Sequence, residues 1–449
     1  MAELTRSVTL LQAVMINLGA IIGAGIFVII GIAIGVAGPS VVLSIVISGI
    51  IAMLTGLNFA EIARHVAKEG GVYEYAKSSF RPFAGFIGGW LWTFGNIIAI
   101  SAVSLSFGGY ADKLLSLSID PLYFALASIA AFAGVNLLGI KNSAKTITVF
   151  VVINIVVLVF FVVAGLFSFN AANISNFMPN GMTGTLAGAA IIFFAFTGFS
   201  RITTISDEVK DPEKTIPRAI IISIVISVFL YAAVALVAVG MVPYTVLAKS
   251  SAPLSTAAQS LNVSLLLIVI AIGGVTATSG VILTGILGTS RVFFAMGRDS
   301  ELPKPLAYID RFATPSTAII TSSLLAVFFL LFVSFGAIVD SSNAAVLSSY
   351  FIINISAIYL YFRLKKEKQQ EKRYMPFVSV AGMLSILLLV SYLDIASLEI
   401  VFGIAILGTA YYIAKNAKIM ENVKWGRHKT VPQSSVVRAF GDSRAEVKK

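Results

Sequence analysis

Residues 19–27 read GAIIGAGIF, and these small residues lie near the middle of an apolar run that extends from residue 10 to 36. A second apolar run, 184–206, carries FFAFTGF at 193–199, again near its middle. A glycine inside a helix costs about 1 kcal/mol relative to alanine. Close packing against a neighbouring helix through small residues is one use that would justify this cost. A break in the helix is the other, and a matched pair of such segments favours it.

The composition around these segments is that of a membrane protein. Of 449 residues, 58% are hydrophobic and 12% are charged, and the mean hydropathy is +0.94. Ordinary globular proteins hold about 25% charged residues, so this chain lacks the charge to cover a water-exposed surface. Runs of about 20 apolar residues cross a bilayer as helices. The sequence therefore predicts an all-α polytopic membrane protein.

Twelve apolar runs are candidate transmembrane helices. If the first ten form two inverted repeats, these repeats are about 10–169 and 184–363, and two extra helices follow in 376–415. The two glycine-bearing runs take equivalent positions in these repeats, which is the best sequence sign of a transporter's central site. Residues 1–415 would be the transporter domain and the polar residues 416–449 a cytoplasmic tail. The runs are 10–36, 40–62, 83–110, 121–139, 146–169, 184–206, 216–241, 262–291, 316–337, 342–363, 376–393 and 397–415.

Lysine and arginine indicate the orientation of these helices. With twelve spans, one side of the membrane holds 29 of the 32 basic residues, because only Lys113 and Lys249 lie on the other side and Arg201 lies within a span. Cytoplasmic loops carry the excess of basic residues in membrane proteins. We therefore expect a multi-pass protein of the cytoplasmic membrane with both termini in the cytoplasm. The net charge of +11 follows from this topology and indicates no nucleic-acid partner.

The inventory of reactive side chains excludes several functions. The sequence has no cysteine and two histidines, His65 and His428, both outside the predicted spans, so we expect no metal centre, haem or other cofactor. No Asp or Glu falls near the middle of a predicted span, which removes the paired acids of an intramembrane enzyme. The nucleotide-binding loop of an ATP-driven pump and the repeated rings of a channel filter are also missing. We expect a transporter rather than an enzyme.

The two predicted breaks would present opposite helix ends to the membrane centre. The outer half of the first helix would begin at the break, where the free amides of Gly25, Ile26 and Phe27 attract a carboxylate. The first half of the second helix would end at 193–196, where free carbonyls attract an ammonium group. A zwitterion such as an α-amino acid fits between them. The predicted substrate-binding residues are Ile21, Gly23, Ala24, Gly25, Ile26, Phe27, Asn96, Phe193, Phe194, Phe196, Thr197 and Gly198, with Phe194 also a gate candidate.

These motifs resemble those of the amino acid–polyamine–organocation (APC) superfamily of transporters. GAGIF at 23–27 is similar to the signature of its first helix, and FFAFTGF at 193–199 to that of its sixth. The resemblance implies a five-plus-five inverted-repeat (LeuT-like) fold with broken helices 1 and 6, and an amino acid permease that works by alternating access. Further similar motifs are GGVYEY at 70–75, DEVKDP at 207–212, IPRAI at 216–220 and MGRD at 296–299.

Positions that set substrate charge and ion coupling vary within this superfamily. Members that carry cations often have an acid where this chain has Ser200, which favours a neutral substrate here and leaves a cationic amino acid or polyamine exchanger as an alternative. Some proton-coupled members have a lysine where our register places Asn154. Thr278 and Ser279 resemble the hydroxyl pair that coordinates sodium in related folds, although hydroxyls more often bond to their own helix. The expected coupling ion is H⁺ or Na⁺, with these three residues as candidates.

Arg201 is the one charged residue that lies well inside a predicted span, since every other one within these runs lies within three residues of an end. A charge at membrane depth is a functional candidate by default. Glu208 lies seven residues further on, which is the same face of an α-helix, so we expect either an ion pair between the two at an inner gate or an Arg201 side chain that reaches toward water. The alternative is an acidic amino acid substrate bound by Arg201. The predicted partners are the amino acid and the lipid bilayer, and the sequence carries no sign of an oligomeric state.

Overall fold

A computed structural model of the chain describes residues 6–425, except 24, 116, 118, 251, 262–263, 333–334 and 368–372. The described residues are almost entirely helical, and their one β-type contact is an isolated bridge between Val8 and Val209. The chain divides into two units, residues 1–405 and 406–449. In the second unit the described residues 406–425 form the end of a single helix.

The first predicted repeat is helical along most of its length. Its elements are α1 (Leu10–Ile21), η1 (Gly25–Ile29), α2 (Ile30–Ala37), η2 (Gly38–Ser40), α3 (Val41–His65), α4 (Val72–Ser79), α5 (Pro82–Leu115), α6 (Pro121–Leu137) and α7 (Ile140–Leu166). A 3₁₀ turn, η3 (Ala171–Ile174), follows.

The remaining helices begin with the second glycine-bearing run. They are α8 (Gly181–Ile192), η4 (Phe193–Glu208), α9 (Pro212–Met241), α10 (Tyr244–Leu247), α11 (Pro253–Gln259), α12 (Ser264–Arg298), η5 (Lys304–Ala307), α13 (Ser316–Phe332), α14 (Phe335–Lys366), α15 (Met375–Val390) and α16 (Ile395–Trp425).

Each of the twelve predicted runs overlaps one helix or two or three consecutive helical elements. By length and composition, eight helical stretches of the described chain suit a membrane crossing, and α6, α13 and α15 are shorter apolar helices. The structure adds α4, α10 and α11 in segments that the sequence analysis left between spans. It also extends α16 to Trp425, so the predicted tail at 416–449 begins as helix, and 426–449 lies outside the described residues.

Local sequence signals account for several helix ends. Thr9 and Gln12 form a capping box at the start of α1, in which each side chain accepts from the backbone amide of the other. Asp120 caps α6 by accepting from the Leu122 amide at 2.9 Å. Gly139, with φ 99°, makes the turn from α6 into α7 in a conformation that favours glycine.

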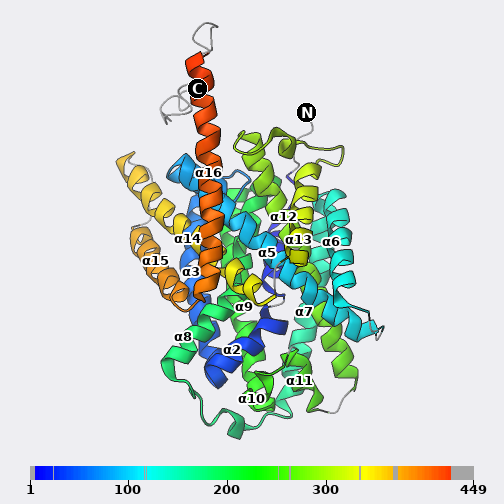
Figure 1. The fold of residues 1–449 in the computed structure, drawn as a ribbon. Coiled ribbons are helices and arrows are strands. Elements are labelled where there is room, and N and C mark those ends of the chain that lie inside the picture. Colours follow the sequence, from blue (N-terminus) through cyan, green and yellow to red (C-terminus); the bar gives the residue numbers. More distant parts are fainter. Residues whose placement is uncertain are drawn as a thin grey trace. The chain divides into compact units, whose positions relative to one another are not determined.

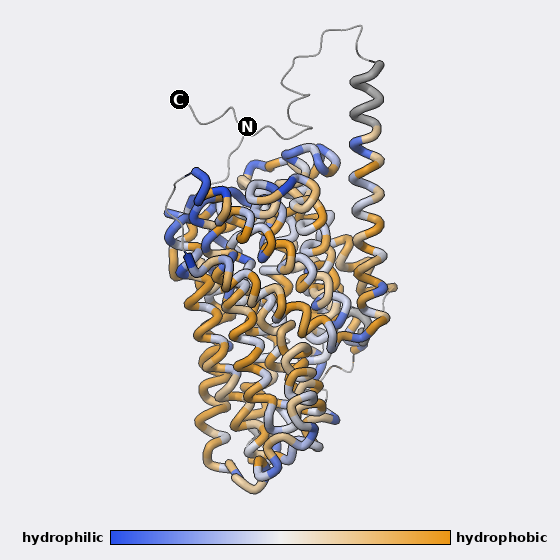
Figure 2. The backbone as a smooth tube through the Cα atoms, turned by 90° about the vertical axis from the view of Figure 1, so that its left-hand side faces the viewer, coloured by the Kyte–Doolittle hydropathy of each residue, from blue (hydrophilic) through white to orange (hydrophobic). Residues whose placement is uncertain are grey.

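Within residues 6–405, α5 is a long, largely enclosed helix that packs against α4, α6, α12, α13 and α14. In contrast, α7 exposes a row of apolar side chains at helical spacing, as expected of a face covered by lipid. The row consists of Val149, Val152, Val156, Val159, Phe160 and Val163. Figure 2 shows the same pattern along the helices, with hydrophobic residues in their middles and hydrophilic residues gathered near their ends.

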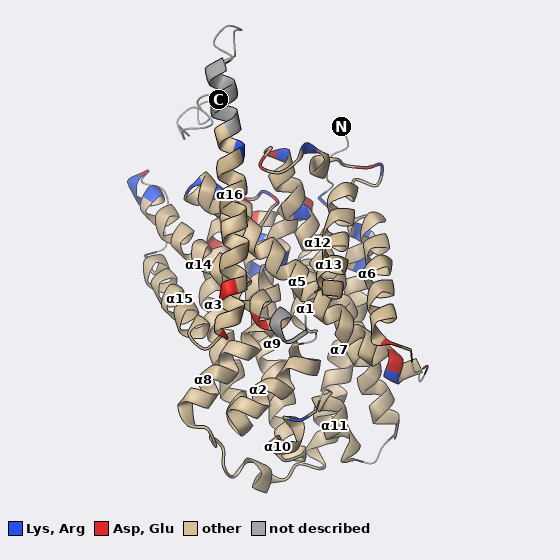
Figure 3. Ribbon diagram, in the orientation of Figure 1, with Lys and Arg blue, Asp and Glu red and all other residues tan. Residues whose placement is uncertain are grey.

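The two broken spans lie side by side. α1 packs against η4, and α2 packs against α8, so the two spans run in opposite directions. Figure 1 places α2 and α8 at the same end as α10 and α11. Figure 3 shows that few lysines and arginines lie at this end, whereas most lie at the opposite end, where α12 and α14 finish.

Candidate functional site

The first broken span loses its α-helical hydrogen bonding at Ile21. The backbone of Ile22 has φ −74° and ψ 91°, Gly23 follows, and the π-helix η1 begins at Gly25. The Ile21 carbonyl accepts a 2.6 Å hydrogen bond from the Tyr231 hydroxyl of α9. The α-helix therefore ends within the glycine-rich run. Ala24, a predicted substrate-binding residue, lies outside the described residues.

The second broken span changes its helix type instead of opening. α8 ends at Ile192, and η4 continues as a 3₁₀-helix to Glu208, with non-helical dihedrals at Ile205. Carbonyls in a 3₁₀-helix accept from the amide three residues further along the chain. The carbonyls at 193–196 therefore have amide partners, whereas the sequence analysis expected them to be free. The Phe194 carbonyl also accepts from the Thr197 hydroxyl at 2.9 Å. An ammonium group would have to use lone pairs that these bonds leave open.

Glycines bring the two breaks into direct contact. A Cβ atom added to Gly25 would lie 2.2 Å from the Cβ of Ala195, and one added to Gly198 would lie 2.4 Å from the carbonyl carbon of Ala20. Real Cβ atoms do not approach this closely. These glycines therefore serve both purposes that the sequence analysis considered. They permit close packing of two helices, and they lie where the α-helices are interrupted.

The large side chains predicted for the site are packed against the breaks. Phe27, Phe193 and Phe196 are fully buried, as is Ile26, and Phe194 has an exposed fraction of 8%. In this structure Phe194 is thus the one member of the phenylalanine set with measurable exposure. Its role as a gate stays a prediction.

Two more tyrosines cap the broken spans. Tyr110 of α5 donates to the Phe27 carbonyl at 2.9 Å. Tyr350 of α14 donates to the Thr197 carbonyl and shares a 2.8 Å hydrogen bond with the Ser200 hydroxyl. The interrupted backbone is thus satisfied by hydroxyls from neighbouring helices. The sequence analysis did not select Tyr110 or Tyr231, for which a single hydroxyl within an apolar run was the available sequence signal.

Tyr231→Phe is expected to destabilise the protein by about 1–3 kcal/mol, because it leaves the buried Ile21 carbonyl without this donor. Thermal unfolding of the purified protein in detergent measures the effect as a lowered Tm. Tyr123→Phe is the matched control, since Tyr123 is 66% exposed on α6. Equal Tm values for the two variants would contradict the role of Tyr231.

Asn17 ties α1 to η4 and α9. Its Oδ1 accepts from the Ile202 amide at 3.0 Å, and its Nδ2 donates to the Ser223 hydroxyl at 3.4 Å. Asn17 is fully buried, so these bonds satisfy a polar group that would otherwise be costly. The sequence analysis did not select it.

Arg201 is buried without an acidic partner among the described residues. Its Nη2 donates to Asn96 Oδ1 at 2.7 Å, and its guanidinium lies 5.0 Å from the ring centroid of Trp92. Its Nε and Nη1 have no hydrogen-bond partner within the described chain. Asn96, predicted to bind substrate, is thus engaged by Arg201 and also donates to the Trp92 carbonyl at 2.7 Å.

The predicted ion pair between Arg201 and Glu208 is wrong for this structure. Glu208 instead accepts from Arg291 of α12 at 3.0 Å, and both side chains are almost completely buried. The prediction assumed α-helical spacing, in which seven residues return to about the same face. In the 3₁₀ geometry of η4, with three residues per turn, seven residues lead to a face about 120° away.

The candidate ion-coupling residues have protein partners. Thr278 and Ser279 donate back to the carbonyls of Gly274 and Val275 of their own helix, each at 2.7 Å. Asn154 accepts from the Thr276 hydroxyl of α12 at 2.6 Å. These bonds leave hydroxyl and amide lone pairs but form no group of cation ligands by themselves.

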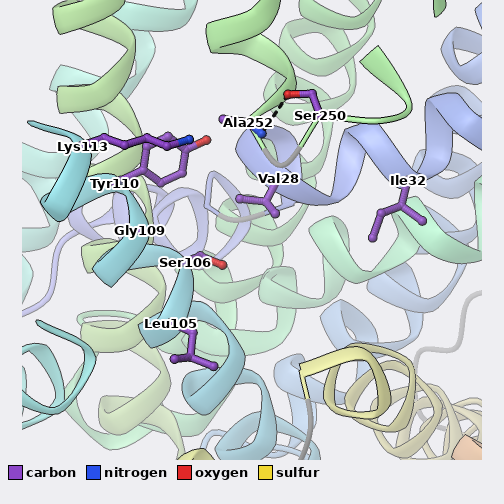
Figure 4. A pocket seen from close by; sticks show the side chains of 9 residues that line it. All are labelled: Val28, Ile32, Leu105, Ser106, Gly109, Tyr110, Lys113, Ser250 and Ala252. Carbon is purple, nitrogen blue, oxygen red and sulfur yellow. Dashed lines mark hydrogen bonds between the residues drawn. The ribbon is translucent and has the colours of Figure 1, made fainter. Parts of the chain in front are cut away.

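A cavity of about 440 Å³ lies beside η1 and α2, rather than between the two breaks. Figure 4 shows its lining residues, which come from η1 and α2, the C-terminal part of α5 and the segment that precedes α11. Tyr110 joins the cavity to the first break, because its ring lines the cavity and its hydroxyl caps Phe27. The lining residues are Val28, Ile32, Leu105, Ser106, Gly109, Tyr110, Lys113, Ser250 and Ala252.

A charged cluster closes the other end of α5. It lies where the loop before α4, α4 itself, the end of η4 and the end of α12 meet, and Lys77 of α4 binds Asp299 there. Next to it, the amides of Ser7 and Val8 both donate to the Glu208 carbonyl at 2.9 Å. The charged cluster consists of Glu69, Glu74, Lys77, Asp207, Glu208, Arg291, Arg298 and Asp299.

Comparison with known proteins gives a family match over residues 8–410, to the family described as amino acid permease. Three relatives with named substrates illustrate it. The branched-chain amino acid permease BcaP of Bacillus subtilis is 30% identical, covering 80% of this chain and 81% of its own. The methylthioribose transporter of the same organism is 30% identical, and the match covers 85% of this chain and 87% of that transporter. The chloroplastic cationic amino acid transporter 9 of Arabidopsis thaliana is 31% identical, and the match covers 67% of this chain and 57% of that transporter.

Proposed function

The chain belongs to the amino acid permease family, and from this premise we propose that it moves an α-amino acid across the cytoplasmic membrane by alternating access. The observation that carries the proposal is the contact between two interrupted helices, with Gly25 against Ala195 and Gly198 against Ala20. η1 and α2 begin at this contact, and the start of a helix attracts a carboxylate.

We propose the five-plus-five LeuT-like arrangement with twelve transmembrane helices and both termini in the cytoplasm. The antiparallel pairing of the two broken spans supports it, since inverted repeats place equivalent helices in opposite directions. The uneven distribution of lysine and arginine supports the orientation (Figure 3).

The two ends of the pathway differ in a way that suits alternating access. The cavity beside η1 lies at the C-terminal end of α5, which would face outward, and the charged cluster lies at its N-terminal end. The charged cluster would therefore be the closed inner end of a carrier that is hollow on its outer side. Separation of this cluster would open the inner end.

We propose a neutral substrate. The described residues of 19–30 and 190–200 include no charged side chain, and a cationic side chain placed there without a counter-charge would be expensive. Ser200, where cation carriers of the superfamily often have an acid, is taken up by bonds with Tyr350 and Trp92.

The second candidate is an acidic amino acid, and Arg201 is the observation that favours it. A buried guanidinium with two nitrogens lacking partners in the described chain could bind a side-chain carboxylate. Its position one residue after Ser200 puts it close to the second break.

Uptake into proteoliposomes tests both candidates. We expect saturable leucine uptake that alanine and valine inhibit, and glutamate or lysine uptake below about a tenth of it, since each 1.4 kcal/mol of burial penalty lowers occupancy about tenfold. Imposing proton and sodium gradients separately identifies the coupling ion, which we propose is one of these two. Robust lysine uptake that leucine does not inhibit would overturn the neutral substrate.

Arg201→Gln separates the two candidates. Gln keeps a donor for Asn96 but removes the charge, so leucine uptake is expected to keep its KM within about threefold, a change of under 1 kcal/mol. If the substrate were acidic, the wild type would take up glutamate and Arg201→Gln would lose that uptake selectively. Comparison of KM and maximal rate for both substrates distinguishes these results.

A further inference from the structure

Glu69 is a buried carboxyl group that the proposed mechanism has not used. It lies in the loop between α3 and α4, it is fully buried, and neither carboxylate oxygen has a hydrogen-bond partner in the described chain. The nearest cation is Arg298 of α12, whose Nη1 lies 3.6 Å from Oε1. That guanidinium is 35% exposed and also contacts Glu74, Asp207 and Asp299. Glu69 thus shares a partly solvated cation with three other acids.

Acids outnumber cations around Glu69, since the charged cluster holds five carboxyl groups and three cations. Glu69, Glu74, Asp207 and Glu208 would place four negative charges against the guanidinium groups of Arg291 and Arg298, and Arg291 is committed to Glu208 at 3.0 Å. Lys77 binds Asp299 and also lies 3.7 Å from Glu74, and on α3 Glu61 contacts Arg64 and His65. The facing groups are Tyr73 and Glu74 of α4, Asp207 and Glu208 of η4, and Arg291, Arg298 and Asp299 at the end of α12.

Within this arrangement, burial and the neighbouring acids favour the neutral form of Glu69. Burial raises the pKa of Glu69 well above its usual range, the carboxyls of Glu208 and Asp207 raise it further, and the cations offset this only in part. Asp299 shows the opposite outcome. Burial alone would raise the pKa of Asp299, but the bound Lys77 and the Tyr73 hydroxyl hold it below its usual range.

The loop that carries Glu69 rests directly on the second broken span. The Gly70 amide donates to the Thr204 carbonyl of η4 at 3.3 Å. Gly71, with φ 53°, lies so close to Thr203 and Thr204 that an added Cβ would be within 3.0 Å of both side chains. A movement of the end of η4 would therefore change the surroundings of Glu69.

We propose that Glu69 is a proton-binding site that controls closure of this end of the permease. It holds a proton while the loop, η4 and α12 are packed together, and it releases the proton to water when they separate. The inference rests on the proposed alternating access.

The direction of the pH effect follows from linkage. Because the pKa of Glu69 is higher in the closed form than in the hydrated, open form, low pH favours closure. This preference is complete below the ordinary glutamate pKa and is lost as the pH rises through the closed-form pKa. Each pH unit within that window changes the ratio of closed to open protein by up to about tenfold.

Cysteine labelling can follow this closure, since the sequence has no cysteine. Ser206→Cys places a thiol at a fully buried position of η4, and Ser175→Cys places one at an exposed position as reference. Both proteins are placed in nanodiscs and labelled with a water-soluble maleimide between pH 6 and 8.5. The rate at 206 divided by the rate at 175 removes the titration of the thiol itself. We expect this ratio to rise about tenfold with pH.

Glu69→Gln, which imitates the protonated acid, is expected to make the ratio independent of pH. Glu213→Gln, at an exposed acid on α9, is expected to keep the rise. Glu69→Asp retains a titratable group and is expected to shift the midpoint of the rise, which provides a test if Glu69→Gln does not fold. A rise that persists unchanged in Glu69→Gln or Glu69→Asp, or no rise in the parent, would overturn the proposal.

Labelling requires no substrate, so its outcome is separate from that of the uptake experiment. A missing pH effect would remove the proton site and leave amino acid transport intact. Absent amino acid uptake with an intact pH effect would instead remove the proposed substrate and leave the proton site.

Discussion

Gly198→Ala is expected to abolish transport, although alanine is the better helix former by about 1 kcal/mol. The added Cβ would lie 2.4 Å from the carbonyl carbon, 2.6 Å from the oxygen and 2.7 Å from the Cβ of Ala20. These are atoms of the α1 backbone or directly attached to it, so no side-chain rotation relieves the overlap. Overpacking of this kind costs about 1–3 kcal/mol or more, and relief would separate the two broken spans.

Leucine uptake and Tm, measured on the same preparations, test this prediction. Gly134→Ala is the matched control, because Gly134 lies in α6 and an added Cβ would meet no atom within 4 Å. We expect the control to equal the wild type or to be slightly more stable. Normal uptake by Gly198→Ala would show that the two spans need not approach as closely as they do here.

Arg291→Met is expected to destabilise the protein by about 3–5 kcal/mol, the largest effect on stability among these variants. The substitution leaves the buried Glu208 without its partner at 3.0 Å, within a charged cluster that already has an excess of acids. The expected result is a strongly lowered Tm and loss of uptake, because the charged cluster loses its most buried ion pair.

A second substitution tests whether the unpaired charge of Glu208 causes this loss of stability. Since a buried ion pair can often be replaced by apolar residues at little cost, Arg291→Met combined with Glu208→Leu is expected to recover much of the lost stability. Uptake should recover less, because the apolar pair cannot take on water when the cluster opens. A double variant as unstable as Arg291→Met alone would mean that packing, and not the unpaired charge, causes the loss.

The helices and their interruptions were accessible from the sequence, because they depend on local composition. Apolar runs of membrane length predicted every long helix, and the glycines at 19–25 marked the end of α1 at Ile21. The short helix α4 was missed because it is amphipathic and lies between spans. The end of α16 was missed because a polar helix and a polar tail have similar composition.

The partners within the site were not accessible in the same way. A run such as FFAFTGF indicates that α8 stops, but it does not distinguish an open break from the 3₁₀-helix that follows. That difference turned Glu208 away from Arg201 and toward Arg291. Likewise Asn96 could be placed at depth, whereas its engagement by Arg201 depends on how α5 meets η4. Contacts across helices need the tertiary arrangement.

The helix type of η4 has a mechanical consequence. A 3₁₀-helix rises about 2.0 Å per residue and an α-helix about 1.5 Å, so the residues from Phe193 to Thr204, before the kink at Ile205, span about 6 Å more than they would as an α-helix. 3₁₀ runs longer than three or four residues are uncommon because their hydrogen bonds are poorly aligned. A change of this segment from 3₁₀-helix to α-helix would shorten it. The shortening would draw Thr204 toward α8 and rotate the side chains of the segment about the helix axis.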